Sequence, residues 1–340
     1  MHISAPSGSD PEPPFPFSAI VDHERAKEAL LLAVLNPAVH GVLFLGPKGT
    51  GKTTLVRSLN SILDNKPIIE LPIGSDEDMV LGSVDAERTL ATGQLCTRPG
   101  ILSRADGAVL YIDEVNLLPD HLVDVILDAA AMGRYHLERE GLSACFRSRF
   151  TLTGSMNPEE GWLRPQLLDR FGLAVHFAPL QQVEERKEVF GRTRRFKADP
   201  QALWRDFASA EEDIRTNLRQ AAENLHNVVI PDEITTSCIE IVLELGIDTH
   251  RAELSALQAS AARAALHGRS EVAFDDLRLT LPMALQHRLG DEETQQDLDW
   301  EKLEKRIIEG RKETESSGKG WFPTPFFRKK KAEKPEPWPR

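Results

Sequence analysis

Apolar residues follow two kinds of pattern along the 340-residue chain, and the change between them lies near residue 180. Before that point, short apolar runs typical of buried strands alternate with segments whose apolar positions recur at helical spacing. The predicted strands are Gly41–Leu45, Ile68–Glu70, Ala108–Asp113, Phe150–Ser155 and Leu173–Phe177. This alternation predicts an α/β domain with a parallel sheet over residues 17–180.

Helical spacing is clearest at three places in this domain. Asp22–Leu35 precedes the first predicted strand, Thr53–Leu63 follows it, and Asp120–Ala131 follows the third. In the last of these, one helix face carries Leu122, Val123, Ile126, Leu127 and Ala130. Amphipathic helices between parallel strands are expected to cover the faces of the sheet.

Beyond residue 180 only helical spacing remains, which predicts an all-α lid domain over residues 181–290. The predicted helices are Val183–Phe190, Pro200–His226, Pro231–Leu245, Arg251–His267 and Phe274–Leu289. Gly246 and Gly268 directly follow two of them, as is common at helix C-termini.

Two details of the lid are predicted for individual residues. Asp275 is expected to cap the N-terminus of the last helix, because its carboxylate can accept a hydrogen bond from an unpaired backbone N–H. The helix before it is expected to bury one face formed by Leu254, Leu257, Ala261 and Ala264.

The two ends of the chain differ in composition from the domains. Residues 1–16 are rich in Pro and Ser and lack the pattern of a signal peptide, so we expect a disordered lead-in. Residues 291–340 are charged, with one predicted helix at Asp297–Ile308. Their last twenty residues interleave aromatic side chains with a basic run at 328–331. We favour a solvated end there over a segment that docks on an acidic partner or an anionic membrane.

Composition narrows the function classes. The 53 acidic and 41 basic residues give a net charge of −12, which argues against general nucleic-acid binding. No run of 18 apolar residues occurs, so no transmembrane segment is expected. The three cysteines are scattered, which fits a reducing cytoplasm and neither a disulfide framework nor a zinc site.

The most specific motif is G-x-x-x-x-G-K-[ST], placed between a predicted strand and a predicted helix. Its members are Gly46, Pro47, Lys48, Gly49, Thr50, Gly51, Lys52 and Thr53. In this context the motif predicts a nucleotide site: the glycines let backbone N–H groups surround the phosphates. Lys52 is expected to contact the β- and γ-phosphates of ATP, and the Thr53 hydroxyl to ligate Mg²⁺.

A second element of the same chemistry is the apolar strand that ends in Asp113 and Glu114. Asp113 is expected to hold Mg²⁺ through water beside Thr53, and Glu114 to polarise the water that attacks the γ-phosphate. An apolar strand with an acidic end is common, so the prediction depends on its place in the α/β alternation after the phosphate loop.

Three further residues are candidates, each with an alternative. Asn157 ends a predicted strand and is expected to orient water or sense the γ-phosphate; before Pro158 it also fits a simple turn. Arg170 is expected to enter the ATP site of a neighbouring subunit; the alternative is that it only forms a surface ion pair. Arg251 is expected to reach a γ-phosphate from the lid; the alternative is that it is only a charged residue at the N-terminus of a helix.

Several longer stretches resemble the AAA+ ATPases, and among them the ATPase (I) subunit of magnesium chelatase. They cover residues 16–21, 77–82, 110–118, 138–141, 157–161 and 163–172 within a likeness over residues 15–290. The resemblance implies that Asn157 is sensor 1, Arg170 the arginine finger and Arg251 the sensor-2 arginine. It also implies a helix-2 insertion near residues 75–105 and a hairpin over 135–149 with its turn at Glu140-Gly141.

The same resemblance implies a homo-oligomeric ring, expected to be a hexamer, that hydrolyses ATP at subunit interfaces. The ring would drive a partner with a von Willebrand-type domain and a large porphyrin-binding subunit, as in chlorophyll or bacteriochlorophyll synthesis. Nucleotide Mg²⁺ is the one metal expected in the chain itself. Three alternatives stay open: a MoxR-like chaperone ATPase, a cobalt chelatase ATPase subunit, and a degenerate scaffold that binds nucleotide without turnover.

Overall fold

The computed structural model of the protein describes residues 13–64, 66–94, 96–139 and 142–289. Its centre is a five-stranded parallel sheet, and each of the five predicted strands is confirmed within two residues at either end. The strand order across the sheet is β2 (Ile68–Leu71), β5 (Val109–Ile112), β8 (Thr151–Met156), β1 (Val42–Leu45) and β9 (Leu173–His176). The carboxyl ends of β5, β8 and β1 therefore lie next to one another, where ligands bind in open parallel sheets.

Alternating side chains of these strands divide the core into two layers, one on each face of the sheet. Val42 and Phe44 pack in one cluster, together with α1 (Glu24–Leu35), α2 (Lys52–Ser58) and much of the lid. Leu43 and Leu45 pack in the other cluster, with α6 (Asp120–Met132) and neighbouring short helices. Because both faces are covered, β1 and β5 are apolar and buried throughout, while β8 buries small polar side chains among its apolar ones.

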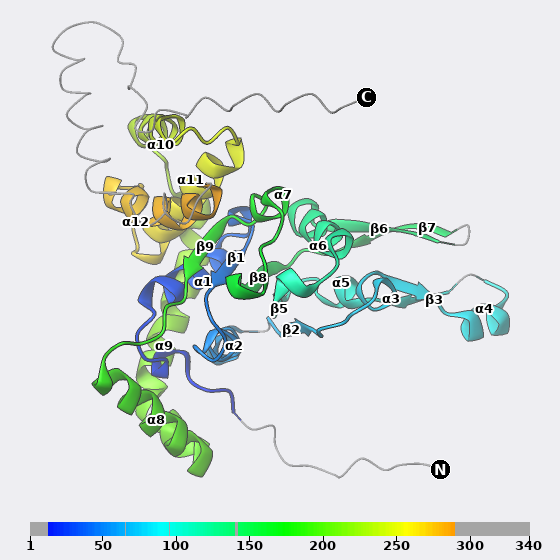
Figure 1. Cartoon of the computed structure of the whole chain (residues 1–340), viewed down its shortest axis with the longest axis horizontal. Helices are drawn as coiled ribbons and strands as arrows, with labels where there is room; N and C mark the ends of the chain where they lie inside the picture. The colour runs from blue at the N-terminus through cyan, green and yellow to red at the C-terminus, as the bar shows by residue number, and fades with distance from the viewer. Residues whose placement is uncertain (1–12, 65, 95, 140–141, 290–340) are drawn as a thin grey trace, which may run out of the picture.

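Two insertions project from the same side of the α/β domain (Figure 1). The first occupies the place of the predicted helix-2 insertion and contains α3 (Glu77–Leu81), β3 (Gly82–Val84), α4 (Ala86–Thr92), β4 (Thr97–Pro99) and α5 (Ile101–Arg104). The second is the predicted hairpin, formed by β6 (Arg134–Arg139) and β7 (Leu142–Arg147).

The remaining helices follow β9, apart from α7 (Pro165–Leu168), which precedes it. They are α8 (Val183–Ala198), α9 (Pro200–Asn224), α10 (Asp232–Glu244), α11 (His250–Leu266) and α12 (Phe274–Leu285), followed by the 3₁₀ turn η7 (Gln286–Arg288). The helices α10, α11 and α12 form one group at the end of the sheet marked by β9 (Figure 1). None of the helices described is long and apolar enough to cross a membrane.

Three predictions in the helical part were wrong. The first of these helices continues to Ala198 instead of ending at Phe190, because contacts with α9 and with residues 15–19 hold its second half. The cap of α12 is Ala273 rather than Asp275, and the side chain of Asp276 accepts from the Ala273 N–H. Leu254 is 54% exposed and does not belong to the buried face of α11.

Four predictions fall outside the described residues: the disorder of most of the lead-in, the turn at Glu140-Gly141, the helix at Asp297–Ile308 and the behaviour of the basic aromatic tail.

A buried charge cluster stabilises the lid. The Asp276 side chain is fully buried and accepts hydrogen bonds from Arg263 (2.7 Å), Arg269 (2.5 Å) and the Ala273 N–H (2.8 Å). Burial alone would raise the pKa of this carboxyl, but these donors lower it below its ordinary value. Arg263 also pairs with Glu28 of α1 at 2.7 Å, so the cluster ties the lid to the α/β domain.

Asp276→Asn is expected to lower the free energy of unfolding by about 3 kcal/mol, because it leaves two guanidinium groups without their shared carboxylate. Since the folded-state pKa is depressed, the stabilisation is present above pH 4 and is lost as pH falls through the folded-state value. Urea unfolding at pH 7 and at pH 3 measures both effects. The exposed Asp275→Asn is the matched control and should change stability by about 0.5 kcal/mol or less; equal midpoints for the two variants would contradict the account.

Candidate nucleotide site

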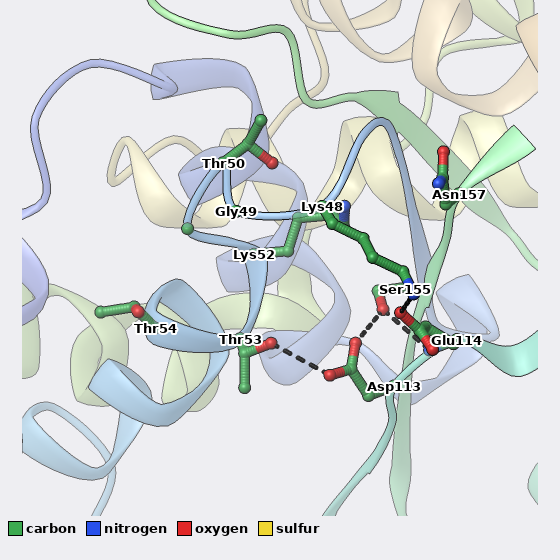
Figure 2. Close-up of a pocket in the computed structure, with 11 residues that line it drawn as sticks. Lys48, Gly49, Thr50, Lys52, Thr53, Thr54, Asp113, Glu114, Ser155 and Asn157 are labelled. Carbon is green, nitrogen blue, oxygen red and sulfur yellow. Dashed lines mark hydrogen bonds and ion pairs between the residues drawn. The ribbon is translucent and has the colours of Figure 1, made fainter. Parts of the chain in front are cut away.

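The loop Gly46–Thr53 connects β1 to α2 at the carboxyl edge of the sheet (Figure 2). Gly49 and Gly51 have φ angles of +76° and +103°, which glycine adopts without strain, and a side chain there would meet open space. Gly46 has a different constraint: a Cβ atom would lie 2.4 Å from the carbonyl oxygen of Phe177. The glycines thus shape an open cradle at the positions that the sequence motif predicts.

A cavity of about 350 Å³ lies against this loop. Residues from the loop, from β5 and from β8 line it: Lys48, Gly49, Thr50, Gly51, Lys52, Thr53, Thr54, Asp113, Glu114, Ser155 and Asn157. The structure therefore brings together most of the residues that the sequence singled out.

Lys52 lies at the base of the cradle, and its side chain curls back along the loop. Its Nζ donates to the carbonyl oxygens of Gly46 and Pro47, both at 2.7 Å. Burial lowers the pKa of this amine, while the nearby Asp113 and Glu114 raise it. A largely buried cation at the floor of an open cradle suits a polyanionic ligand such as a triphosphate.

Asp113 is the centre of a hydroxyl cluster (Figure 2). Its carboxylate accepts from Thr53 Oγ1 at 3.3 Å, from Tyr111 OH at 2.9 Å and from Ser155 Oγ. Hydroxyl and carboxylate oxygens are the ligands that Mg²⁺ prefers, so Thr53 and Asp113 fit the metal predicted for them.

Tyr111 and Ser155 also belong to this cluster, although no sequence motif pointed to either of them. Tyr111 is buried in β5, and its hydroxyl lies 3.1 Å from Thr53 Oγ1; burial, more than any other cause, raises its pKa far above the ordinary value. Ser155 Oγ accepts from the Glu114 N–H at 3.1 Å. Ser155 thus connects the two acidic residues across neighbouring strands.

Ser155→Ala is expected to reduce ATP turnover about tenfold, because a hydrogen bond to a charged group contributes about 1.5 kcal/mol. Thr153→Val is the matched control: Thr153 lies two residues earlier on the same strand, and its hydroxyl has no hydrogen-bond partner within the described residues. The control should keep turnover within about twofold of the parent protein, since it removes no bond to the site. Equal losses in both variants would contradict the role assigned to Ser155.

Glu114 occupies a left-handed backbone conformation with φ +53°, which is uncommon outside glycine and clusters at functional sites. Its carboxylate pairs with Lys48 Nζ at 3.1 Å, and Lys48 also pairs with Glu160 at 2.7 Å. The bond to Glu160 and then the bond to Glu114 raise the pKa of Lys48. Glu114 is thus turned into the cavity and held there by a residue of the phosphate loop.

Asn157 follows β8 and lines the cavity, as predicted for a residue that contacts the end of a triphosphate. It also starts a turn, because its Oδ1 accepts from the Glu159 N–H at 3.3 Å. The two interpretations of this residue are therefore compatible.

Arg170 and Arg251 do not line the cavity. Arg170 Nη1 pairs with Asp128 at 2.6 Å and with Asp124 at 3.0 Å, both on α6. Arg251 pairs with Asp169 at 3.2 Å. Asp169, which pairs with Arg251, directly precedes Arg170 in the sequence. Neither arginine lines the cavity at the phosphate loop of its own chain.

A second cavity of about 300 Å³ adjoins the loop, and three residues line both cavities: Thr50, Gly51 and Thr54. The rest of its wall is largely apolar and comes from the start of the chain, from residues after β9 and from α8, including Phe15, Ile20, Phe177, Val189 and Phe196. A flat apolar group attached to a phosphate chain would fit between these walls.

Comparisons with known proteins agree with this geometry. The family model of the AAA domain (dynein-related subfamily) matches residues 41–171, and that of the AAA lid domain matches residues 235–309. The magnesium-chelatase subunit ChlI homolog of Methanocaldococcus jannaschii is 40% identical over 332 residues, which cover 87% of this chain and 91% of the relative. The magnesium-chelatase 38 kDa subunit of Rhodobacter capsulatus is 41% identical over 315 residues, covering 83% and 90%.

The fold also recurs at low identity. A crystal structure of a putative ATPase from Cytophaga hutchinsonii superimposes with a TM-score of 0.62 at 17% identity, over 86% of this chain and 91% of that one. This second likeness concerns the fold alone.

Proposed function

The chain belongs to the family of magnesium-chelatase ATPase (I) subunits within the AAA+ proteins, and from that premise we propose that it hydrolyses ATP in a ring of its own copies. The ring would act as the motor of a chelatase, in which partner subunits insert a metal ion into a tetrapyrrole. The observation that carries the proposal is the convergence of the phosphate loop, Asp113 and Glu114 on one cavity.

The residues of that cavity have separable roles in the proposed reaction. Lys52 and the N–H groups of the loop contact the phosphates. Thr53 and Asp113 would hold Mg²⁺, which would supply positive charge to offset that of the phosphate oxygens. Glu114 accepts a hydrogen bond from the attacking water and draws its proton away, and Asn157 orients the same water. The protein thus supplies position and charge, which is most of what phosphoryl transfer needs.

The adjoining apolar cavity accommodates the base of the nucleotide. It opens beside Thr50, Gly51 and Thr54, so a base there is continuous with phosphates in the cradle. Its wall includes Phe177 after β9 and Phe196 on α8. The position of α8 is therefore expected to depend on whether a nucleotide is bound.

The position of Arg170 supports hydrolysis in a ring. The Arg170 side chain is 26% exposed and does not line the cavity of its own chain, whereas transition-state charge on the γ-phosphate needs a cation. A second copy that presents Arg170 to this cavity would complete the site. The ion pairs to Asp124 and Asp128 then have to yield to the triphosphate, which is a stronger anion.

Partner subunits are proposed from the relatives, whose names identify them as subunits of magnesium chelatase. In the described part of this chain no group of three His, Cys, Asp or Glu side chains is arranged to hold a metal. We therefore assign the inserted metal and the tetrapyrrole to a large partner subunit, and the transmission of the motor's work to a partner with a von Willebrand-type domain.

One experiment tests this assignment. The tagged chain is purified from its native source with ATP and Mg²⁺, its bound proteins are identified, and phosphate release is measured with and without them. The proposal expects a chelatase-type large subunit among them and ATP hydrolysis by the complex. Hydrolysis with only proteins unrelated to tetrapyrrole metabolism would contradict the client, and absence of hydrolysis would contradict the motor.

A further inference from the structure

The segment that carries Arg170 is held by a buried arginine of the lid, Arg288 in η7. The Arg288 side chain is 2% exposed, and its Nε pairs with Asp169 Oδ1 at 2.9 Å. Its Nη2 donates to the carbonyl oxygens of Asp169 at 2.8 Å and Phe171 at 2.9 Å, and its Nη1 to that of Gly172 at 3.3 Å. One guanidinium therefore fixes the residues on both sides of Arg170.

Neighbouring residues of the same 3₁₀ turn extend this grip. The Nε2 atom of His287 lies 2.9 Å from the carbonyl oxygen of Phe171, and Nε2 of Gln286 donates to the carbonyl oxygen of Ala174. Burial, with a smaller effect of Arg288, lowers the pKa of His287 well below its ordinary value, so the ring is neutral and Nε2 carries the proton that it donates. The backbone after Arg170 is thus bound to the lid at successive carbonyls.

The backbone around Arg170 is also packed against residues outside the lid. A Cβ atom on Gly172 would lie 1.4 Å from the Val39 carbonyl oxygen, so the chain passes directly against residues before β1. Asp169 is further engaged through Oδ2 by Thr249 and Arg251, both at 3.2 Å. The backbone of residues 169–172 is consequently fixed, while the partly exposed Arg170 side chain pairs with Asp124 and Asp128 of α6.

We propose that Arg288 is a positioning residue for Arg170: its buried guanidinium fixes the backbone of Asp169, Phe171 and Gly172 and so aims Arg170 at the ATP site of the next protomer. This rests on the shared-site function proposed above. Bidentate and multiple backbone contacts suit Arg and not Lys, because the guanidinium presents five donors in a fixed fork. A finger displaced by about 1 Å would lose about a hundredfold in rate.

The test uses Arg288→Lys, which keeps the buried charge but loses the fork. Alone, the variant is expected to bind ATP as the parent does and to turn it over about a hundredfold more slowly. Arg278→Gln on α12 is the control, because Arg278 is 42% exposed and makes a single long contact to Asp275; it should stay within twofold.

Mixing experiments separate a positioning role from a general loss of structure. An Arg288→Lys protomer has an intact phosphate loop and Glu114, whereas a Glu114→Gln protomer has an intact finger. The mixture is expected to recover turnover at interfaces that join the two, and a mixture of Arg170→Ala with Glu114→Gln is expected to do the same. A mixture of Arg288→Lys with Arg170→Ala is expected to recover none, because both lack an aimed finger.

Three results would overturn the inference: turnover of Arg288→Lys within twofold of the parent, loss of its ATP binding, or failure of its mixture with Glu114→Gln while Arg170→Ala and Glu114→Gln do complement. Failure of the Arg170→Ala mixture itself would instead overturn the shared-site function.

Discussion

Arg170→Ala is expected to lower ATP turnover by a factor of about 10³ or more while leaving nucleotide binding nearly intact. The reason is geometric: the side chain makes no contact with its own nucleotide cavity, so its removal leaves that cavity as it was. What is lost is the cation that a neighbouring chain supplies to the transition state. Phosphate release and equilibrium binding of a fluorescent ATP analogue measure the two effects separately.

A control is available at the other end of the same short helix, since Arg164 directly precedes α7 and Arg170 lies two residues after it. Arg164 is 74% exposed and pairs with Asp120, so Arg164→Ala removes a similar surface ion pair without touching the finger. It should keep turnover within about twofold of the parent, since an exposed pair contributes 1 kcal/mol or less. If both alanine variants hydrolyse ATP normally, Arg170 is a surface charge paired with Asp124 and Asp128 and nothing more.

Glu114→Gln is expected to lower turnover about 10²- to 10⁴-fold, again with ATP binding retained. The amide has the shape of the carboxylate and still accepts a hydrogen bond from Lys48, but it cannot draw a proton from water. Single-turnover measurement with bound ATP isolates this step from binding and product release.

Glu160→Gln tests whether the effect belongs to Glu114 rather than to the charge around Lys48. Both carboxylates pair with the same amine, at 3.1 and 2.7 Å, but only Glu114 lines the cavity. Glu160→Gln should therefore change turnover about threefold or less. Equal losses in the two glutamine variants would show that the pairing with Lys48, and not proton transfer at Glu114, limits the rate.

Local patterns were enough to predict the strands of the sheet and the loop with the phosphate-binding motif between β1 and α2. The apolar runs of β1 and β5 are buried along their whole length and are bounded by glycine or polar residues, which is the pattern of central strands in a parallel sheet. The motif residues meet at the edge of the sheet because the strands that precede them are parallel neighbours.

What the sequence did not reveal depends on tertiary neighbours. The contact of Ser155 with Asp113 exists because β8 lies next to β5, an order that no local pattern encodes. The helix α12 begins at Phe274 as predicted, but its cap was assigned to the wrong residue: the local capping rule favours Asp275, whereas Ala273 is the cap and Asp276 is engaged by Arg263 and Arg269. The role of Arg288 could not be predicted locally, since the partners on both sides of Arg170 lie 117 and 119 residues earlier in the chain.

The most direct test of the account is the rate of ATP hydrolysis per chain as the protein is diluted, with the state of assembly followed by analytical ultracentrifugation in the same buffer. If neighbouring chains share each site, the rate per chain falls toward zero as rings dissociate into single chains, while each chain still binds ATP. A rate per chain that stays constant at dilutions where only monomers sediment would contradict the claim that a second copy completes the site.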